Sequence, residues 1–499
     1  MRKKLLTTVV TAAIMTTVLA GCGKDNDAVT SSGNGSTETE NPEKDEIVTL
    51  TFASLGTEAA CQDQVMAAIN EKLLADGLNI QVRVKLLDDY WQKLALDIAG
   101  GEEYDLAWAH SSTLADLVSK KVYVPITDVL DSAGQELKAK TPEYALKGGS
   151  VNGEIYAIPR VIPNTGYNNV FAVRKDLMDK YEIESITTIE ELETYFQAIL
   201  DHEDGVYPYS GNNIAPMMPV YANYHFVLDI SAPALYVDPQ DPDLTVKSFW
   251  ESEEFVKICE KRKEWLDKGY MVTDSSKVDN ASYAYEYGKI AAADSNVMGV
   301  SEQVANMVQS CPEGQPYTVY LEPDQRWIFN AGDNMLAVPS TSKHVEEAVQ
   351  LIQWFKCNQE NYDLWSYGVE GINYKRDGEA IDVSDIAPEN VYSPMIWMWN
   401  DIDMARFPAC FKAEEIERLR NWDNQSKPSP LLGFTLDQSS VKAEISQMNA
   451  VLAEYSANLA SGVVDIHDVR DEVLKKLKAA GIDKVIEETQ RQVDAFVGK

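Results

Sequence analysis

The cysteine at position 22 has the sequence context of a residue that is covalently modified. Residues 19–22 read LAGC, and they follow three basic residues at 2–4 and an apolar stretch over 5–20. This is the layout of a lipoprotein signal, in which the peptide is cut before the cysteine and the thiol takes lipid. The apolar stretch is too short and too rich in threonine to span a bilayer stably. We therefore expect residues 1–21 to be a signal peptide and Cys22 to be lipidated; an ordinary secretory signal with a chance cysteine is the alternative.

The other residue types that could do chemistry show no catalytic or metal-binding spacing. Five cysteines remain, an odd and widely spread set without a C-x-x-C pair: Cys61, Cys259, Cys311, Cys357 and Cys410. We expect most of them to be buried, and one long-range disulfide stays open. Five scattered histidines give no metal site, and no HExxH, P-loop or nucleophile elbow occurs. Asp238, Asp241 and Asp243 could bind Ca²⁺, but two interleaved prolines and a missing distal Glu favour an exposed turn. The sequence predicts no catalytic residue, no metal and no cofactor.

The charge and length of the chain limit its partners and its architecture. The formal charge of −35 argues against nucleic acid or anionic lipid as a partner and disfavours strongly anionic ligands. The alternative explanation is that this charge keeps a secreted protein soluble. Residues 22–46 are polar and predict a flexible linker, so the folded body begins near Ile47. That body is long enough for two lobes.

Strand-like and helix-like patterns alternate at the start of the body. The expected strands are 47–54, 80–87 and 105–109, and the expected helices are 59–75 and 90–99. This alternation predicts a parallel sheet with helices on both faces. Ligands of such sheets bind at the carboxyl ends of the strands, which draws attention to residues 54–58 and 108–112.

Helical patterns dominate the later part of the chain. Thr188 and Glu191 have capping-box spacing at the start of an expected helix over 187–200. We expect further elements at 250–268 (helix), 335–338 (strand), 344–357 (helix) and 439–498 (helices). Gly462 and Gly481 are the expected breaks in the last stretch.

Several passages, taken in order, resemble one known family. They are 93–106 (KLALDIAGGEEYDL), 152–159 (NGEIYAIP), 174–177 (RKDL), 287–292 (YGKIAA) and 338–348 (VPSTSKHVEEA). Their order and spacing resemble the extracellular solute-binding proteins of family 1. A further set resembles the long-lipoprotein branch, which has its own C-terminal domain: 367–371 (YGVEG), 432–434 (LGF) and 477–483 (LKAAGID), with Glu488, Gln490 and Gln492.

The resemblance implies an α/β, two-lobed periplasmic-binding-protein-like fold of type II with hinge-connected lobes and a helical C-terminus. On that pattern, lobe one takes 47–160 plus 316–373, and lobe two takes 163–312 plus 376–432. Residues 433–499 form the C-terminal helical segment.

The resemblance also implies a function. The chain would be a monomeric, lipid-anchored protein on the extracellular face of the cytoplasmic membrane, in a Gram-positive host. It would capture a carbohydrate, commonly an oligosaccharide in this family, and deliver it to the permease subunits of an ABC importer. Three alternatives stay open: a binding protein for peptide or another small solute, a cell-surface glycoside hydrolase, and a sensor or adhesin.

A sugar site needs aromatic platforms for the apolar faces of the rings and fixed polar groups for the hydroxyls. Residues 105–110 are similar to the cleft segment of maltose-type binding proteins, in which the tryptophan stacks on sugar. The candidate ligand-binding residues are Glu58, Trp108, His110, Tyr167, Asn168, Asn296, Trp327, Asn334 and Trp399. The alternatives are core packing for the tryptophans, a helix start for Glu58 and hinge packing for Tyr167. If the stretch around residue 398 is extended, Trp397 and Trp399 share one face.

Overall fold

The computed structural model describes residues 47–272, 285–299, 307, 310–330, 332–408 and 411–499. The predicted signal peptide, the lipidation at Cys22, the linker and Cys410 lie outside these residues. Within them, none of the helices has the length and apolarity needed to cross a bilayer. Cys61, Cys259, Cys311 and Cys357 are free thiols in this part of the chain, and none of them forms a disulfide.

Lobe one is built on a five-stranded sheet of order β2-β1-β3-β15-β6. Its strands are β1 (Val48–Ser54), β2 (Ile80–Leu86), β3 (Leu106–His110), β6 (Ala157–Pro159) and β15 (Asn334–Ala337). Its helices are α1 (Gln62–Ala75), α2 (Tyr90–Ala99), α3 (Ser111–Ser119), α4 (Thr127–Ser132), α5 (Gln135–Lys140), α6 (Glu143–Gly148), α13 (Val345–Lys356) and α14 (Gln359–Tyr367). A small hairpin, β4 (Ser150–Val151) with β5 (Glu154–Ile155), completes it.

The sheet of lobe one follows directly from the alternating sequence pattern. β1 pairs in parallel with β2 and β3, with Phe52 opposite both Val84 and Leu106. The side chains of Val65, Ile69 and Leu73 lie on one face of helix α1 and are buried in the core of the lobe. β15 returns to this sheet antiparallel to β3 and β6, so the sheet is mixed where the sequence predicted a parallel one.

Lobe two contains a four-stranded sheet, β13-β7-β12-β8, and a three-stranded sheet, β11-β10-β9. The strands are β7 (Val170–Arg174), β8 (Tyr207–Ser210), β9 (His225–Asp229), β10 (Pro233–Val237), β11 (Lys247–Ser248), β12 (Ile290–Ser295) and β13 (Pro316–Val319). The helices are α7 (Lys175–Lys180), α8 (Ile189–His202), α9 (Met218–Tyr221) and α10 (Glu253–Asp267), with short 3-10 turns η1 (Ala215–Met217) and η2 (Phe249–Glu251). The capping box of Thr188 and Glu191 at the start of α8 is present as predicted.

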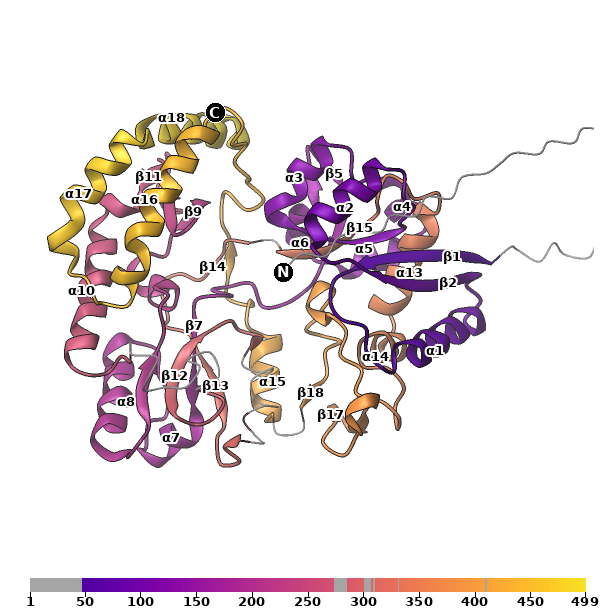
Figure 1. Cartoon of the computed structure of the whole chain (residues 1–499), viewed down its shortest axis with the longest axis horizontal. Coiled ribbons are helices and arrows are strands. Elements are labelled where there is room, and N and C mark those ends of the chain that lie inside the picture. The colour runs from indigo at the N-terminus through magenta and orange to yellow at the C-terminus, as the bar shows by residue number, and fades with distance from the viewer. Residues whose placement is uncertain (1–46, 273–284, 300–306, 308–309, 331, 409–410) are drawn as a thin grey trace, which may run out of the picture. The chain divides into compact units, whose positions relative to one another are not determined.

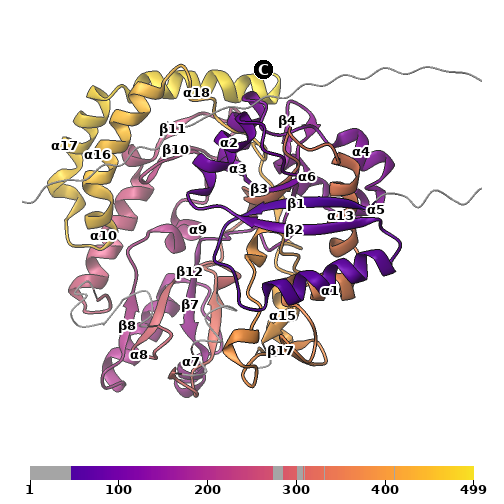
Figure 2. The same ribbon diagram turned by 45° about the vertical axis from the view of Figure 1, so that its right-hand side comes forward.

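Three long helices end the chain: α16 (Lys442–Ala460), α17 (Ile466–Ala479) and α18 (Ile482–Val497). The breaks fall at Gly462 and Gly481, as predicted, and both glycines have positive φ angles. Figure 1 shows these helices in yellow beside α10, and the turned view of Figure 2 shows the same arrangement. Their buried residues, such as Leu452, Val473 and Val485, belong to the same hydrophobic cluster as Phe171 of lobe two. The C-terminal segment therefore shares the core of lobe two.

The segments between the lobes pack on one another. β14 (Trp327–Ile328) pairs in parallel with β19 (Lys427–Pro428), and Val161 forms a bridge with Asp401. A third hydrophobic cluster holds these crossings together and includes Ile162, Tyr320 and Trp422. The remaining elements here are β16 (Lys375–Asp377), β17 (Ala380–Asp382), η3 (Pro388–Asn390), η4 (Ile396–Met398), β18 (Phe407–Pro408) and α15 (Ala413–Arg420).

Two of the lobe boundaries expected from the sequence differ from the structure. Residues 316–319 were expected in lobe one, but β13 pairs antiparallel with β7 in lobe two, on the side of β7 opposite to β12. Residues 376–432 were expected in lobe two, but Met398 and Trp399 lie in the hydrophobic cluster of lobe one. The pattern of a short strand does not say which sheet edge it will join, and within 376–432 it is the stretch at 398–399 that packs in lobe one, while Leu431 lies in the core of lobe two as expected.

Candidate ligand-binding cleft

A cavity of 2330 Å³ is lined by residues from both lobes, the crossings and the C-terminal segment. Small-molecule sites in proteins typically occupy roughly 300–1000 Å³. The size of the cavity therefore suits an extended ligand of several rings. Among the predicted site residues, His110, Tyr167, Asn168 and Asn296 line it.

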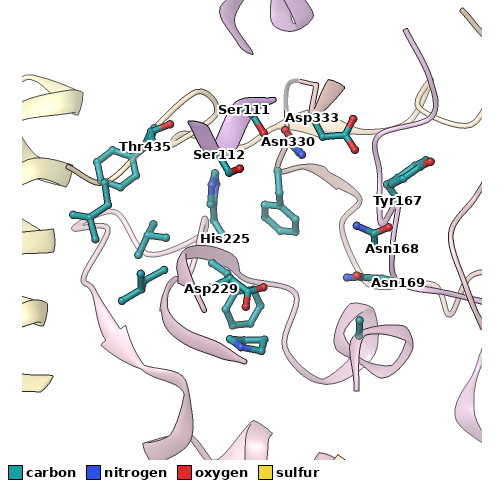
Figure 3. Close-up of a pocket in the computed structure, with 18 of the residues that line it drawn as sticks. Ser111, Ser112, Tyr167, Asn168, Asn169, His225, Asp229, Asn330, Asp333 and Thr435 are labelled. Atoms are coloured by element: carbon teal, nitrogen blue, oxygen red, sulfur yellow. The ribbon is translucent and has the colours of Figure 1, made fainter. Parts of the chain in front are cut away.

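Tyr167, Asn168 and Asn169 form one end of the cavity, as Figure 3 shows. They lie in a turn after the first crossing, where the backbone amide of Asn169 donates to the carbonyl of Gly166 at 2.8 Å. Gly166 has φ +56°, and a Cβ there would lie 2.2 Å from the ring of Tyr320, so only glycine fits. The amide of Val297 donates to the carbonyl of Tyr167 at 2.9 Å and ties this turn to lobe two.

A buried ion pair holds this end of the cavity to lobe one. The Arg160 guanidinium donates to both carboxylate oxygens of Asp333, at 2.7 and 2.6 Å, in a bidentate geometry. The same guanidinium lies 5.0 Å from the centre of the Tyr167 ring, a cation–π distance. Arg160 thus connects the β6 end, the loop before β15 and the ring of Tyr167.

The wall from lobe one is the N-terminal turn of α3. The His110 ring accepts a hydrogen bond from the amide of Ser112 at 3.2 Å, which makes it the N-cap of the helix. The amide of Ser111 donates to the carbonyl of Asp333 at 2.9 Å. Burial lowers the pKa of His110, so its neutral form is favoured. Ser111 and Ser112 line the cavity (Figure 3), and the hydroxyl oxygen of Ser112 lies 2.8 Å from His110 Nδ1.

The floor from lobe two is fixed by a buried network around Arg262. This side chain is fully buried and donates to the hydroxyl of Tyr209 and the carbonyl of Gly211, both at 2.7 Å. Tyr209 in turn donates to Asp294, which also accepts from the amide of Asn213 at 3.0 Å. Burial raises the pKa of Asp294.

Asn296 lies just beyond this network. Its side-chain oxygen accepts from the amide of Gly299 at 2.6 Å. The amide side chain is thereby held in one orientation at the cavity wall.

His225 is a cavity residue that the sequence did not single out. It begins β9, and its Nδ1 lies 2.7 Å from the hydroxyl oxygen of Ser429. Burial lowers its pKa to about 4, so the ring is neutral near pH 7. No sequence motif surrounds His225. Its contact with Ser429, more than 200 residues later in the chain, is a feature of the tertiary structure that no local pattern encodes.

Trp108 and Asn334 contact each other and do not line the cavity. The indole N–H of Trp108 donates to the side-chain oxygen of Asn334 at 2.9 Å, and Trp108 is 8 % exposed. Its ring packs against Trp91 and Trp397 at centroid distances of 4.3 and 5.0 Å. The packing alternative weighed for Trp108 is the arrangement that the structure shows.

Trp399 lies in the core of lobe one, where its N–H donates to the hydroxyl of Ser366 at 3.1 Å. The extended conformation considered for this stretch does not form, because residues 396–398 make the 3-10 turn η4. Trp327 is in β14 and Glu58 is exposed ahead of α1; neither lines the cavity.

Asn169, Asn330 and the two serines of α3 also line the cavity (Figure 3); they lie in segments that the sequence pointed to but were not among the candidate ligand-binding residues. Asp229 and Thr435 line it as well. They share only short polar side chains in loops or at the ends of elements. Asn169 and the serines adjoin predicted residues, so the sequence pointed to their neighbourhoods. Asp229 and Thr435 had no such signal.

Two family models match the chain. Residues 64–371 match the bacterial extracellular solute-binding proteins, and residues 430–498 match a domain of unknown function. A carbohydrate ABC transporter substrate-binding protein of Streptococcus pneumoniae serotype 4 is 25% identical over 457 residues, covering 87% of this chain and 88% of that protein.

Solved structures show the same two-lobed fold. The N-glycan transport solute binding protein of Streptococcus pneumoniae superposes with a TM-score of 0.73 at 20% identity, covering 91% of this chain and 99% of that one. Its complexes with Man1GlcNAc and Man5GlcNAc give TM-scores of 0.67 and 0.65, each at 20% identity and with 90% of this chain covered. They cover 100% and 99% of those chains. The fold is thus the two-lobed, type II periplasmic-binding-protein fold.

Proposed function

Because the chain belongs to the bacterial extracellular solute-binding protein family, we propose that it captures an oligosaccharide in the cavity between its lobes and delivers it to an ABC importer. The observation that carries this proposal is the composition of the cavity wall. Hydroxyl and amide side chains of Ser111, Ser112, Asn168 and Asn169 project from separate elements onto one elongated space. Sugar hydroxyls both donate and accept, and such groups match them. The S. pneumoniae relatives, named for carbohydrate and N-glycan transport, support the choice of ligand class.

Two of the carboxyl groups that line the cavity are engaged within the protein. Asp333 is paired with Arg160, and Asp294 is bonded to Tyr209 and Asn213. A glycoside hydrolase needs two free carboxyl groups on either side of a sugar bond. Neither of these two aspartates is therefore a free carboxyl group of the kind that such a catalytic pair requires.

Capture follows from differential contacts in two conformations. Three crossings join the lobes, and α3 and Asn296 belong to different lobes. A ligand that touches both walls at once favours the conformation in which the walls approach each other. The importer then recognises that closed geometry.

We assign Cys22 the role of membrane attachment on the outer face, with the protein acting as a monomer. Replacement by serine (Cys22→Ser) is expected to release the protein from the membrane fraction into the medium. Retention of this variant in the membrane fraction would contradict the assignment.

The ligand class is tested by thermal unfolding of the full-length protein with a defined glycan panel. The panel holds Man1GlcNAc, Man5GlcNAc and linear gluco-, xylo- and manno-oligosaccharides of several lengths. A ligand present at 100 times its Kd stabilises the folded state by about 2.7 kcal/mol, which raises the midpoint. A rise with peptides and with none of the glycans would overturn the carbohydrate assignment. Reducing-sugar release on incubation would overturn the non-catalytic one.

A further inference from the structure

The C-terminal segment supplies one wall of the cavity. Phe434, Thr435, Gln438, Ser456 and Phe496 line it, and all of them lie in the region 430–498 that matches a domain of unknown function. Thr435 lies at one end of the cavity in Figure 3, and Tyr167 and Asn168 lie at the opposite end. A ligand that contacts both ends must therefore span the cavity from the turn at Asn168 to this wall.

This wall is attached firmly to lobe two. The amide and hydroxyl of Ser231, in the turn after β9, both donate to the side-chain oxygen of Asn449 in α16, at 2.7 and 2.5 Å. Arg262 donates to the carbonyl of Ala460 at the end of α16. The cavity surface of α16 and the end of β9 thus move together.

Asp229, the last residue of β9, stands two residues before that attachment. It lines the cavity, as Figure 3 shows. Within the described residues, no side chain or backbone group donates a hydrogen bond to its carboxylate, and no cation pairs with it. The protein around it desolvates the carboxyl group and raises its pKa. A carboxylate in this setting has its acceptor positions available to a ligand.

The aromatic pair Phe434 and Phe496 faces the same cavity. The two rings meet edge to face with centroids 5.6 Å apart, and Phe496 is 47% exposed. A large exposed aromatic side chain at a cavity wall is a surface for the apolar face of a sugar ring.

We propose that Asp229 and the C-terminal segment form a distal sugar subsite, in which the carboxylate accepts hydrogen bonds from ring hydroxyls and Phe434 and Phe496 contact the apolar ring face. This subsite deepens the proposed function and rests on it. It holds the far residues of a long, neutral oligosaccharide, whereas the turn at Tyr167 holds the near residues. The C-terminal segment thereby selects for ligand length.

The test is calorimetric titration of the full-length protein with short and long members of the same glycan series. The probes are Man1GlcNAc against Man5GlcNAc, and disaccharides against hexasaccharides of each linear series. We expect Asp229→Asn and Phe496→Ala each to weaken binding of the long glycan by roughly tenfold, the usual effect of losing one charge-assisted hydrogen bond or one aromatic contact. Binding of the short glycan is expected to stay within about twofold.

Asp204→Asn is the matched control, because it removes one exposed carboxylate of lobe two that does not line the cavity. Thermal unfolding of each variant separates loss of fold from loss of binding. Equal affinity of both variants and the wild type for the long glycan would overturn the subsite alone. Equal weakening of the short and long glycans would also overturn it. Absence of wild-type binding to every glycan of the panel would overturn the proposed function, and the subsite with it.

Discussion

At the scale of single residues, the cleft depends on polar groups that are fixed by partners within the protein. Arg160 is 4% exposed and donates to both carboxylate oxygens of Asp333. The next residue, Asn334, accepts a hydrogen bond from the indole N–H of Trp108 through its side-chain oxygen. Removal of one member of a buried pair is costly because the other charge remains without compensation. The pair therefore matters more for holding the crossing against lobe one than for touching the ligand.

We predict that Arg160→Met lowers the free energy of unfolding by about 2 kcal/mol. This lies below the roughly 3–5 kcal/mol of a fully buried pair because Asp333 keeps partial contact with water. The matched control is Arg376→Met, which breaks an exposed pair with Glu370 and should cost under about 0.5 kcal/mol. Denaturant titration of both variants measures the difference, and equal losses would refute the role given to Arg160.

His225 gives a prediction for pH dependence. Its pKa is about 4 in the folded protein and about 6.5 in the unfolded chain. Between these values the unfolded chain binds a proton that the folded protein does not, so stability falls as pH falls from 6.5 to 4. Above pH 6.5 both states are neutral and this contribution is constant.

Between pH 6.5 and 4, protonation linked to His225 should lower the free energy of unfolding of the wild type by about 3 kcal/mol. We expect His225→Gln to lack this loss. The measurement is the difference in unfolding free energy between wild type and variant at several pH values. His202→Gln, at an exposed site on α8, is the control. A wild-type-minus-variant difference that does not change between pH 4 and 6.5 would count against the neutral, buried ring.

At the scale of elements, the end of α16 is pressed against α10. Gly462 has φ +70°, and a Cβ at this position would lie 2.5 Å from the carbonyl oxygen of Arg262. Gly269 follows α10 in the same way with φ +77°, but nothing lies within 4 Å of its Cβ position. The two glycines thus share the backbone requirement and differ only in the close approach.

Gly269→Ala should cost about 1 kcal/mol for the positive φ alone. Gly462→Ala should cost at least about 1 kcal/mol more, because backbone of α10 must shift to admit the methyl group. The comparison is made by thermal or denaturant unfolding. Similar losses for both variants would show that α16 is free to move away from α10.

The sequence predicted most of the elements and part of the cleft. The strands and helices of lobe one, the capping box of α8 and the C-terminal helices follow from local patterns, since periodicity and caps are encoded in neighbouring residues. His110, Tyr167, Asn168 and Asn296 were found because each follows a strand or crossing that the sequence reveals.

The remaining site residues depend on tertiary pairing. Trp108 and Trp399 carry the residue type expected of a sugar platform, but burial against Trp397 and Trp365 decided their place. Asp229 of β9 and Thr435 of the C-terminal segment line one cavity, and Ser231 after β9 is bonded to Asn449 of α16. No local pattern encodes that contact.

At the scale of the whole molecule, the C-terminal segment is part of lobe two and of the cavity wall. Its helices complete the core of lobe two, and its surface continues the wall of the cavity. Tyr167 of the crossing turn and Thr435 of this segment lie at opposite ends of the cavity (Figure 3), whose volume of 2330 Å³ suits several sugar rings. The contact groups are divided between the two lobes, as a mechanism of closure on the ligand requires.

The most direct test of this account is a crystal structure of the full-length protein with the longest panel glycan that it binds. We predict that the sugar chain runs along the cavity, from Tyr167 and Asn168 to Asp229 and Phe496, with Ser111 and Ser112 of lobe one in contact with it. A glycan bound at the surface outside this cavity would contradict the central claim.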